Sequence, residues 1–252
     1  MTRWLIPLLP ALLLLAGCSY RYYADPLTPL NEAEQGENKS VADDGTVTHT
    51  QGRLEVGLRP MTDEELNRQF SSFSMDGADS RNPYTFGNST YFRTGETPQR
   101  FTVFRATISN YQYPKVYLDP ERVYITTSNG RKYYALTREQ LWIYYHRYVG
   151  GGHGGGDPGM SGNAHHVWKE RDGILRSTMF PDLPVFSAQE AEGYLVFRPL
   201  APDVEELTVH IPGLVVRYDF RGDPAEMVDI AMRFEREIGR VYPDGSRVAT
   251  SE

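Results

Sequence analysis

The chain of 252 residues contains a single cysteine, Cys18. One cysteine cannot form a disulfide within the chain, so the fold has to be stabilised by its apolar core alone. Long apolar runs are missing as well. The run at residues 4–16 holds thirteen residues, whereas a membrane-spanning helix needs about 20. The sequence therefore predicts neither a disulfide-stabilised domain nor a transmembrane helix.

Positive charge is in the minority, because 26 lysines and arginines stand against 33 aspartates and glutamates, for a formal net charge of −7. An acidic chain has no overall electrostatic attraction for nucleic acid or for anionic lipid headgroups. We therefore expect no nucleic-acid partner. Tyrosine, in contrast, is abundant, with seventeen residues. Together with many valines, isoleucines, phenylalanines and threonines, it favours strands over helices.

The first eighteen residues have the organisation of an export signal: a short basic start, the apolar run, and small residues before Cys18. The motif Leu15-Ala16-Gly17-Cys18 resembles the lipobox of bacterial lipoproteins. This resemblance implies that residues 1–17 are a signal peptide that is removed. It also implies that Cys18 carries a diacylglyceryl thioether and usually a third acyl chain, palmitate for example, which anchor the protein in the membrane. Ser19, where inner-membrane members often have aspartate, favours the outer membrane and leaves open which face.

Residues 18–45 are polar, contain two prolines, and include an acidic, amide-rich run at residues 31–38. Such a segment buries too little apolar surface to offset the entropy of ordering. We therefore predict a flexible tether between the anchor and a domain that covers residues 46–252. Tyr20, Tyr22 and Tyr23 allow two interpretations: they lie in the lipid headgroup layer, where amphipathic rings are common, or they belong to an early strand.

Alternating apolar residues predict strands in three regions. Residues 46–59 form the first, followed by a short helix that a capping-box pattern, Thr62 to Glu65, introduces. Residues 71–100 are predicted to be a long loop, with a brief strand near residues 91–92. In the block 101–136, Asn129-Gly130 separates two strand runs and predicts a tight hairpin. In the block 192–237, apolar residues at a spacing of two predict a last strand with one wet face: Val228, Ile230, Met232 and Phe234.

The two later blocks resemble a family of small immunoglobulin-like domains on bacterial surface lipoproteins, most of them of unknown function. The resemblance rests on the strand at residues 102–110, which ends in Asn110, on Leu118-Asp119-Pro120, on the hairpin at residues 129–133, and on Gly193 to Phe197. It implies an antiparallel β-sandwich with a binding or scaffolding role and no catalytic residues. This chain departs from the family pattern at residues 137–186, where it carries an insert.

The insert is predicted to contain two short helices on either side of a glycine-rich loop. Thr137 to Gln140 is another capping-box pattern, which introduces the first helix at residues 141–149. Residues 150–162 include eight glycines and are expected to form a flexible surface loop. The second helix is predicted to begin after His166 and to end near Met179.

Four of the six histidines lie in the insert, with an aspartate among them: His146, His153, Asp157, His165 and His166. Neutral imidazoles together with a carboxylate suit zinc, copper or nickel. Their spacing matches no known metal motif, and the alternative is a solvated loop with unpaired histidines. We therefore predict no cofactor and keep a metal-binding lipoprotein as the alternative function.

Aromatic residues crowd the insert, and those expected to anchor a protein interface are Trp142, Tyr145, Tyr148 and Trp168. The alternative is that these rings fill the seam between the insert and the sandwich. Nucleophile-elbow, phosphate-loop and zinc-protease motifs are all missing from the sequence. We therefore expect a non-catalytic, lipid-anchored envelope protein that binds or scaffolds a protein partner. A cell-wall polymer hydrolase is a third hypothesis, without a motif to support it.

Overall fold

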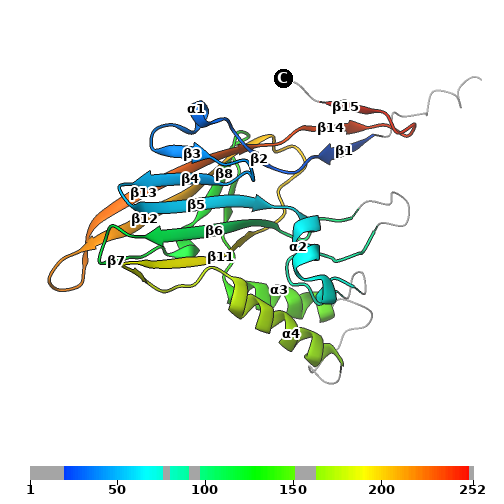
Figure 1. Cartoon of the computed structure of the whole chain (residues 1–252). Coiled ribbons are helices and arrows are strands. Elements are labelled where there is room, and N and C mark those ends of the chain that lie inside the picture. Colours follow the sequence, from blue (N-terminus) through cyan, green and yellow to red (C-terminus); the bar gives the residue numbers. More distant parts are fainter. Residues whose placement is uncertain (1–19, 76–79, 91–96, 151–162, 250–252) are drawn as a thin grey trace, which may run out of the picture.

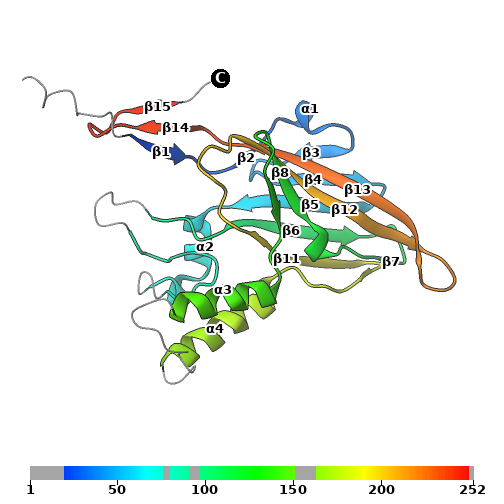
Figure 2. The same ribbon diagram turned by 180° about the vertical axis from the view of Figure 1, so that it is seen from behind.

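The computed structural model describes residues 20–75, 80–90, 97–150 and 163–249, and within these it leaves out the side chains of residues 146–150 and 163–164. Two five-stranded antiparallel sheets pack face to face, and the helices Asp63–Gln69, Arg138–Gly150 and Asn163–Thr178 gather on one side of them (Figures 1 and 2). The protein is thus mainly β, which confirms the predicted fold class.

The first sheet has the strand order β11-β6-β5-β4-β3. Its strands are β3 (Lys39–Val41), β4 (Val47–Gln51), β5 (Leu54–Met61), β6 (Thr102–Asn110) and β11 (Gln189–Phe197). The single strand predicted over residues 46–59 is in fact the hairpin of β4 and β5. The two strands are joined by Gly52 and Arg53. Gly52 has φ of 64°, a conformation that costs glycine little, so the tight turn is hidden within an alternating sequence pattern.

The second sheet has the order β2-β13-β12-β8-β9. Its strands are β2 (Thr28–Pro29), β8 (Tyr124–Thr127), β9 (Lys132–Tyr134), β12 (Glu206–Tyr218) and β13 (Pro224–Glu235). The predicted hairpin at Asn129-Gly130 is confirmed, since β8 and β9 pair across it. A two-stranded sheet of β7 (Lys115–Val116) and β10 (Val185–Phe186) lies at one end of the sandwich. Short 3-10 helices are present at Ser71–Phe73 and at Pro120–Arg122.

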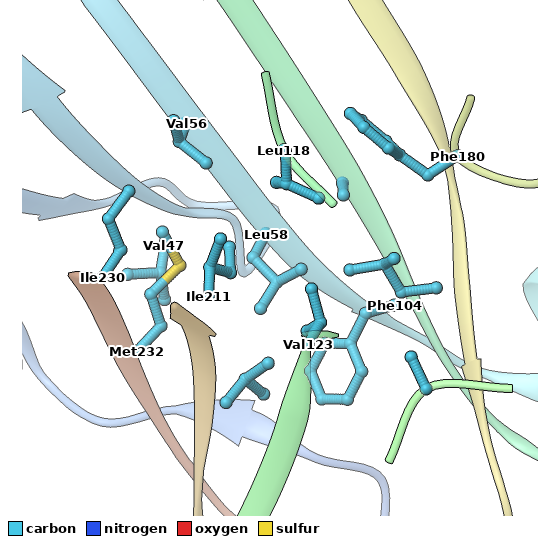
Figure 3. Packing of buried hydrophobic residues seen from close by; sticks show 14 of the residues in the cluster. Val47, Val56, Leu58, Phe104, Leu118, Val123, Phe180, Ile211, Ile230 and Met232 are labelled. Atoms are coloured by element: carbon cyan, nitrogen blue, oxygen red, sulfur yellow. The ribbon is translucent and has the colours of Figure 1, made fainter. Parts of the chain in front are cut away.

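The main core lies between the two sheets (Figure 3). The alternation predicted for β6 is confirmed, because Phe104, Ala106 and Ile108 all belong to this core. The ring of Phe104 lies 5.1 Å from that of Phe234, centroid to centroid, and thereby connects the two sheets. Side chains at this depth contribute about 1.5–3 kcal/mol each, so this layer accounts for most of the apolar stabilisation of a chain that has no disulfide.

The prediction of a flexible tether is wrong for residues 20–45. Strand β1 (Arg21–Ala24) pairs with β14 (Ile238–Val241), which also pairs with β15 (Arg247–Ala249). Strand β2 is an edge strand of the second sheet, and β3 is an edge strand of the first. Helix α1 (Glu32–Gln35) lies between them in the sequence. Tyr22 and Tyr23 thus lie in an early strand, and Tyr20 directly precedes it. The segment has few apolar side chains, but exposed strand edges elsewhere in the chain supply hydrogen-bond partners that composition alone does not reveal.

The remaining helices are α2 (Asp63–Gln69), α3 (Arg138–Gly150) and α4 (Asn163–Thr178). The two predicted capping boxes are both present. Thr62 and Glu65 exchange hydrogen bonds at the start of α2. Before α3, the backbone N–H of Gln140 donates to Thr137 Oγ1 at 3.2 Å, and the Thr137 N–H donates to Gln140 Oε1 at 3.1 Å. Both helices begin where the sequence predicts because these bonds are local. No helix of the described residues is long and apolar enough to cross a membrane.

Candidate binding surface on the helical insert

A second apolar core lies on the outer face of the first sheet, away from the main core. The opposite faces of β6 and β11 contribute Val103 and Val196 to it, and α2 contributes Leu66. From the insert, α3 supplies Leu141 and Tyr145, and α4 supplies Leu175. The helices of the insert therefore pack against one end of β6 and β11, where Val103 and Val196 lie (Figure 1). The seam between insert and sandwich is filled, and the helices are held in fixed positions.

Tyr145, one of the four predicted interface residues, is buried in this seam with 2% of its surface exposed. Its hydroxyl donates a hydrogen bond to the carbonyl of Pro83. The guanidinium groups of Arg171 and Arg100 lie 4.8 Å and 5.6 Å from the centre of its ring. Burial raises the pKa of Tyr145 to about 12, against the opposite effect of the two arginines. Tyr145 thus stabilises the insert and is not available to a partner.

The segment after α2, predicted as a loop with few apolar anchors, is packed into the same seam. Tyr84 is fully buried, and its ring lies 5.1 Å from that of Tyr194. Ser80 accepts hydrogen bonds on its carbonyl from Arg171, at 3.1 Å from Nε. Asn82 Nδ2 donates to Ser74 Oγ at 2.9 Å. Sequence reasoning missed these anchors because they are polar and their partners lie on distant elements. The suggested strand at residues 91–92 lies outside the described residues.

Trp142 and Trp168, two further predicted interface residues, line one groove between α3 and α4. The groove has a volume of about 460 Å³. Trp142 is 40% exposed, and the neighbouring Ile143 is 46% exposed. The ring of His165 stacks on Trp168 with centroids 5.9 Å apart. The aromatic residues of α3 therefore fall into two groups. Those toward the sheet, such as Tyr145, fill the seam, and Trp142 lies at the surface. The side chain of Tyr148, the fourth candidate, lies outside the description.

A buried carboxylate fixes the angle between the two helices beside this groove. Asp172 of α4 forms ion pairs with Arg138 of α3 at 2.9 Å and with Arg176 at 2.8 Å. Asp172 is 8% exposed, whereas both arginines reach the surface. The groove is therefore lined by two tryptophans, an isoleucine and four charged side chains.

Two further hollows adjoin the groove. One of about 530 Å³ lies between the start of α3, the end of α4 and β11, and it shares Arg138 and Arg176 with the groove. The other, of about 370 Å³, shares Ile143 and extends toward Phe101 and Pro199. The three hollows lie around the first turns of α3 and share lining residues, with apolar and charged side chains in their walls. We call these three hollows together the α3 surface.

The predicted metal candidates are only partly described. His165 and His166 lie in the first turn of α4, with ring centroids 6.4 Å apart. The side chain of His146, and all of His153 and Asp157, lie outside the described residues, as does Cys18. Among the residues that the structure describes, no group of three or more histidine, cysteine, aspartate or glutamate side chains could hold a metal ion.

The fold and this surface define a mainly β, antiparallel protein with a helical insert that carries aromatic grooves. No family model matches the chain, and neither the curated proteins nor the solved structures contain a match to it.

Proposed function

We propose that this protein is a lipid-anchored protein of the cell envelope that binds a partner protein, without catalysis, through the α3 surface. The single observation that carries the proposal is the groove of Trp142 and Trp168, which remains open although the seam beneath it is filled. Tryptophan in a preformed pocket is the residue type that most often dominates the binding energy of protein interfaces. The arginines at the rim supply the polar margin that such interfaces have.

The anchor part of the proposal is supported by the motif Leu15-Ala16-Gly17-Cys18. Its test is the mass of the mature protein purified from membranes, beside a Cys18→Ser variant. We expect cleavage before Cys18 and the added mass of lipid chains, both lost in the variant. A full-length or unlipidated mature chain would contradict the anchor.

The binding part is tested by cross-linking the native lipoprotein in its own envelope. We expect one protein partner to be recovered in stoichiometric yield, and its recovery to fall at least tenfold in the double variant Trp142→Ala, Trp168→Ala. The matched control is Phe220→Ala, because Phe220 is an aromatic residue that is 91% exposed in the turn between β12 and β13. Equal recovery from the double variant and the control would contradict binding through the α3 surface.

The metal and hydrolase alternatives are examined on the same purified, untagged protein. Stoichiometric zinc or copper that is lost on changing His153, His165 and His166 to alanine would favour a metal-binding lipoprotein. Activity on peptidoglycan would favour the hydrolase. The proposal predicts neither result.

A further inference from the structure

The three-stranded sheet β1-β14-β15 projects beyond the end of the sandwich (Figures 1 and 2). We propose that one face of this sheet is a membrane-contact surface that lies in the phospholipid headgroup layer. The proposal rests on the lipid anchor at Cys18 in the proposed function, and it adds a second, non-covalent contact between the folded body and the bilayer.

The face in question carries three tyrosines, an arginine and a valine: Tyr20, Tyr22, Tyr242, Arg240 and Val248. Register places Tyr22 opposite Arg240 and Arg240 opposite Val248. Tyr20 and Tyr242 lie two residues from members of this row, so they share its side of the sheet. We call this side the tyrosine face. Tyr22 and Val248 are 55% and 52% exposed, although both belong to paired strands.

The aromatic rings of the tyrosine face are organised around its one cation. The guanidinium carbon of Arg240 lies 4.5 Å from the ring centre of Tyr20 and 6.0 Å from that of Tyr22. Tyr20 also contacts Tyr242, with ring centroids 6.2 Å apart. Amphipathic rings with a cation on an apolar stem are the combination that suits the boundary between acyl chains and phosphates. The face thus offers ring surface to glycerol and acyl groups and a guanidinium to phosphate.

The opposite side of the same sheet is built differently, and it is satisfied internally. The ring of Tyr23 lies over Gly239, where an added Cβ would come within 2.6 Å of the ring. Its hydroxyl donates to Glu237 at 2.5 Å, and Arg247 lies 3.8 Å from the ring centre while pairing with Asp25 at 2.7 Å. Asp25 and Glu237 are thus engaged on the side away from the tyrosine face and do not pair with Arg240.

Chain length commits the sheet to the membrane rather than to another partner. Only Ser19 and Tyr20 separate Cys18 from the first residue of β1. Three residue steps span at most roughly 11 Å of extended chain. The headgroup layer on each side of a bilayer is about 5–8 Å thick. A lipidated Cys18 therefore holds β1 at the membrane surface, and the exposed rings beside it meet the headgroups.

The test uses full-length lipidated protein in vesicles of phosphatidylethanolamine and phosphatidylglycerol. Because Cys18 is the chain's one cysteine and is blocked by lipid, Val248→Cys gives a unique thiol for a fluorescent label. Phe220→Cys, at the opposite end of the sandwich, is the matched control. We expect headgroup-attached nitroxide lipids to quench the label at position 248 at least threefold more strongly than the label at position 220.

Proximity to the anchor is separated from contact by a second pair of proteins. One carries ten glycine and serine residues inserted between Ser19 and Tyr20, and the other carries this insertion together with Tyr22→Ser and Arg240→Ser. Quenching at position 248 that persists with the insertion and is lost in the second protein supports the tyrosine face. The proposal is overturned if the label at position 248 is quenched no more than the label at position 220. It is also overturned if the insertion alone abolishes the quenching at position 248. Lipidation is measured separately by mass, so a missing anchor is distinguished from a face that does not bind.

Discussion

Gly193 shows how a single hydrogen in place of a methyl group can fix the packing of the insert on the sheet. It lies in β11, and a Cβ there would come within 2.4 Å of the Cα of Phe180, which follows the end of α4. The backbone of residues 179–180 thus runs directly across Gly193. Met179 forms an isolated bridge to Tyr194 at the same place. This close approach joins the insert to both apolar cores.

We therefore expect Gly193→Ala to lower the free energy of unfolding by about 1–3 kcal/mol, since the backbone of residues 179–180 has to move. The matched control is Gly173→Ala in α4, where nothing lies within 4 Å of the added methyl group. That change should raise stability by about 0.5–1 kcal/mol, because alanine favours helix. Urea unfolding measures both, and equal effects would contradict the close contact.

Asp63, the first residue of α2, gives stability a dependence on pH. Burial raises its pKa to about 6, although Arg100 acts in the opposite direction. At pH values between 3.8, the pKa of the carboxyl in the unfolded chain, and about 6, its pKa in the folded protein, the native state holds more of the Asp63 proton than the unfolded chain does. Its contribution to stability is thus full below pH 3.8 and is lost as the pH rises through 6.

Asp63→Asn removes this titration, so the variant should gain stability relative to the natural chain between pH 4.5 and pH 7. Urea unfolding at several pH values measures the difference. Glu64→Gln, at the exposed next position of α2, is the control and should leave the difference flat. A pH-independent gap between the natural chain and Asp63→Asn would show that the carboxyl is not buried in solution.

At the scale of the element, the two capping boxes explain which helices the sequence could predict. Thr62 with Glu65 and Thr137 with Gln140 each lie three residues apart, so the signal for the start of α2 and α3 is wholly local. The faces of α3 could not be predicted in the same way. Aromatic residues surround this helix, so periodicity does not distinguish Trp142 at the surface from Tyr145 in the seam. Only the position of β6 and β11 decides between them.

The helix hairpin depends on Asp172, which pairs with both Arg138 and Arg176. We expect Asp172→Asn to destabilise the hairpin by about 1 kcal/mol, because both pairs are lost while the arginines remain partly in water. Amide hydrogen exchange should show faster exchange in α3 with little change in β6. The control is Glu139→Gln, since Glu139 is exposed and its pair with Arg138 is long at 3.6 Å. Unaltered exchange in α3 would show that apolar packing alone fixes the hairpin.

At the scale of the whole molecule, the insert and the β1-β14-β15 sheet lie far apart. The helices of the insert lie beyond β11 at one edge of the first sheet, whereas the small sheet projects from the end of the sandwich and lies apart from them in both views (Figures 1 and 2). The first sheet itself is roughly 19 Å wide, because its five strands lie about 4.8 Å apart. If the tyrosine face lies on the bilayer, the α3 surface is presented well above the headgroups, where a partner protein can reach it.

The early segment is the part of the fold that the sequence predicted least well. Gln35, a buried residue within it, shows why. Its side chain donates to the carbonyl of Arg233 at 2.6 Å and accepts from the Arg233 N–H at 2.9 Å, and these partners are 198 positions away. Local composition carries no trace of such bonds. The strands of the later blocks were predictable because their alternation reflects a buried and a wet face of each strand.

We expect Gln35→Ala to lower the free energy of unfolding by about 1–3 kcal/mol, since it leaves backbone groups of β13 without their partner. Glu37→Ala, at an exposed position of the same segment, should change it by less than about 0.5 kcal/mol. Chemical denaturation of the lipid-free Cys18→Ser protein measures both. Equal free energies of unfolding for the two variants would contradict the burial of Gln35 and would favour a flexible tether at residues 18–45.

The pairing of β1 with β14 also sets the order in which the molecule is completed. Tyr23 is synthesised early, but its partner Glu237 follows 214 residues later. Closing a loop of that length costs more entropy than closing the local hairpins β4–β5 or β12–β13. Strand β1 is therefore made first and paired last. Until residues 238–241 are synthesised, β1 is an unpaired strand, and in this interval it is exposed to pairing with other chains.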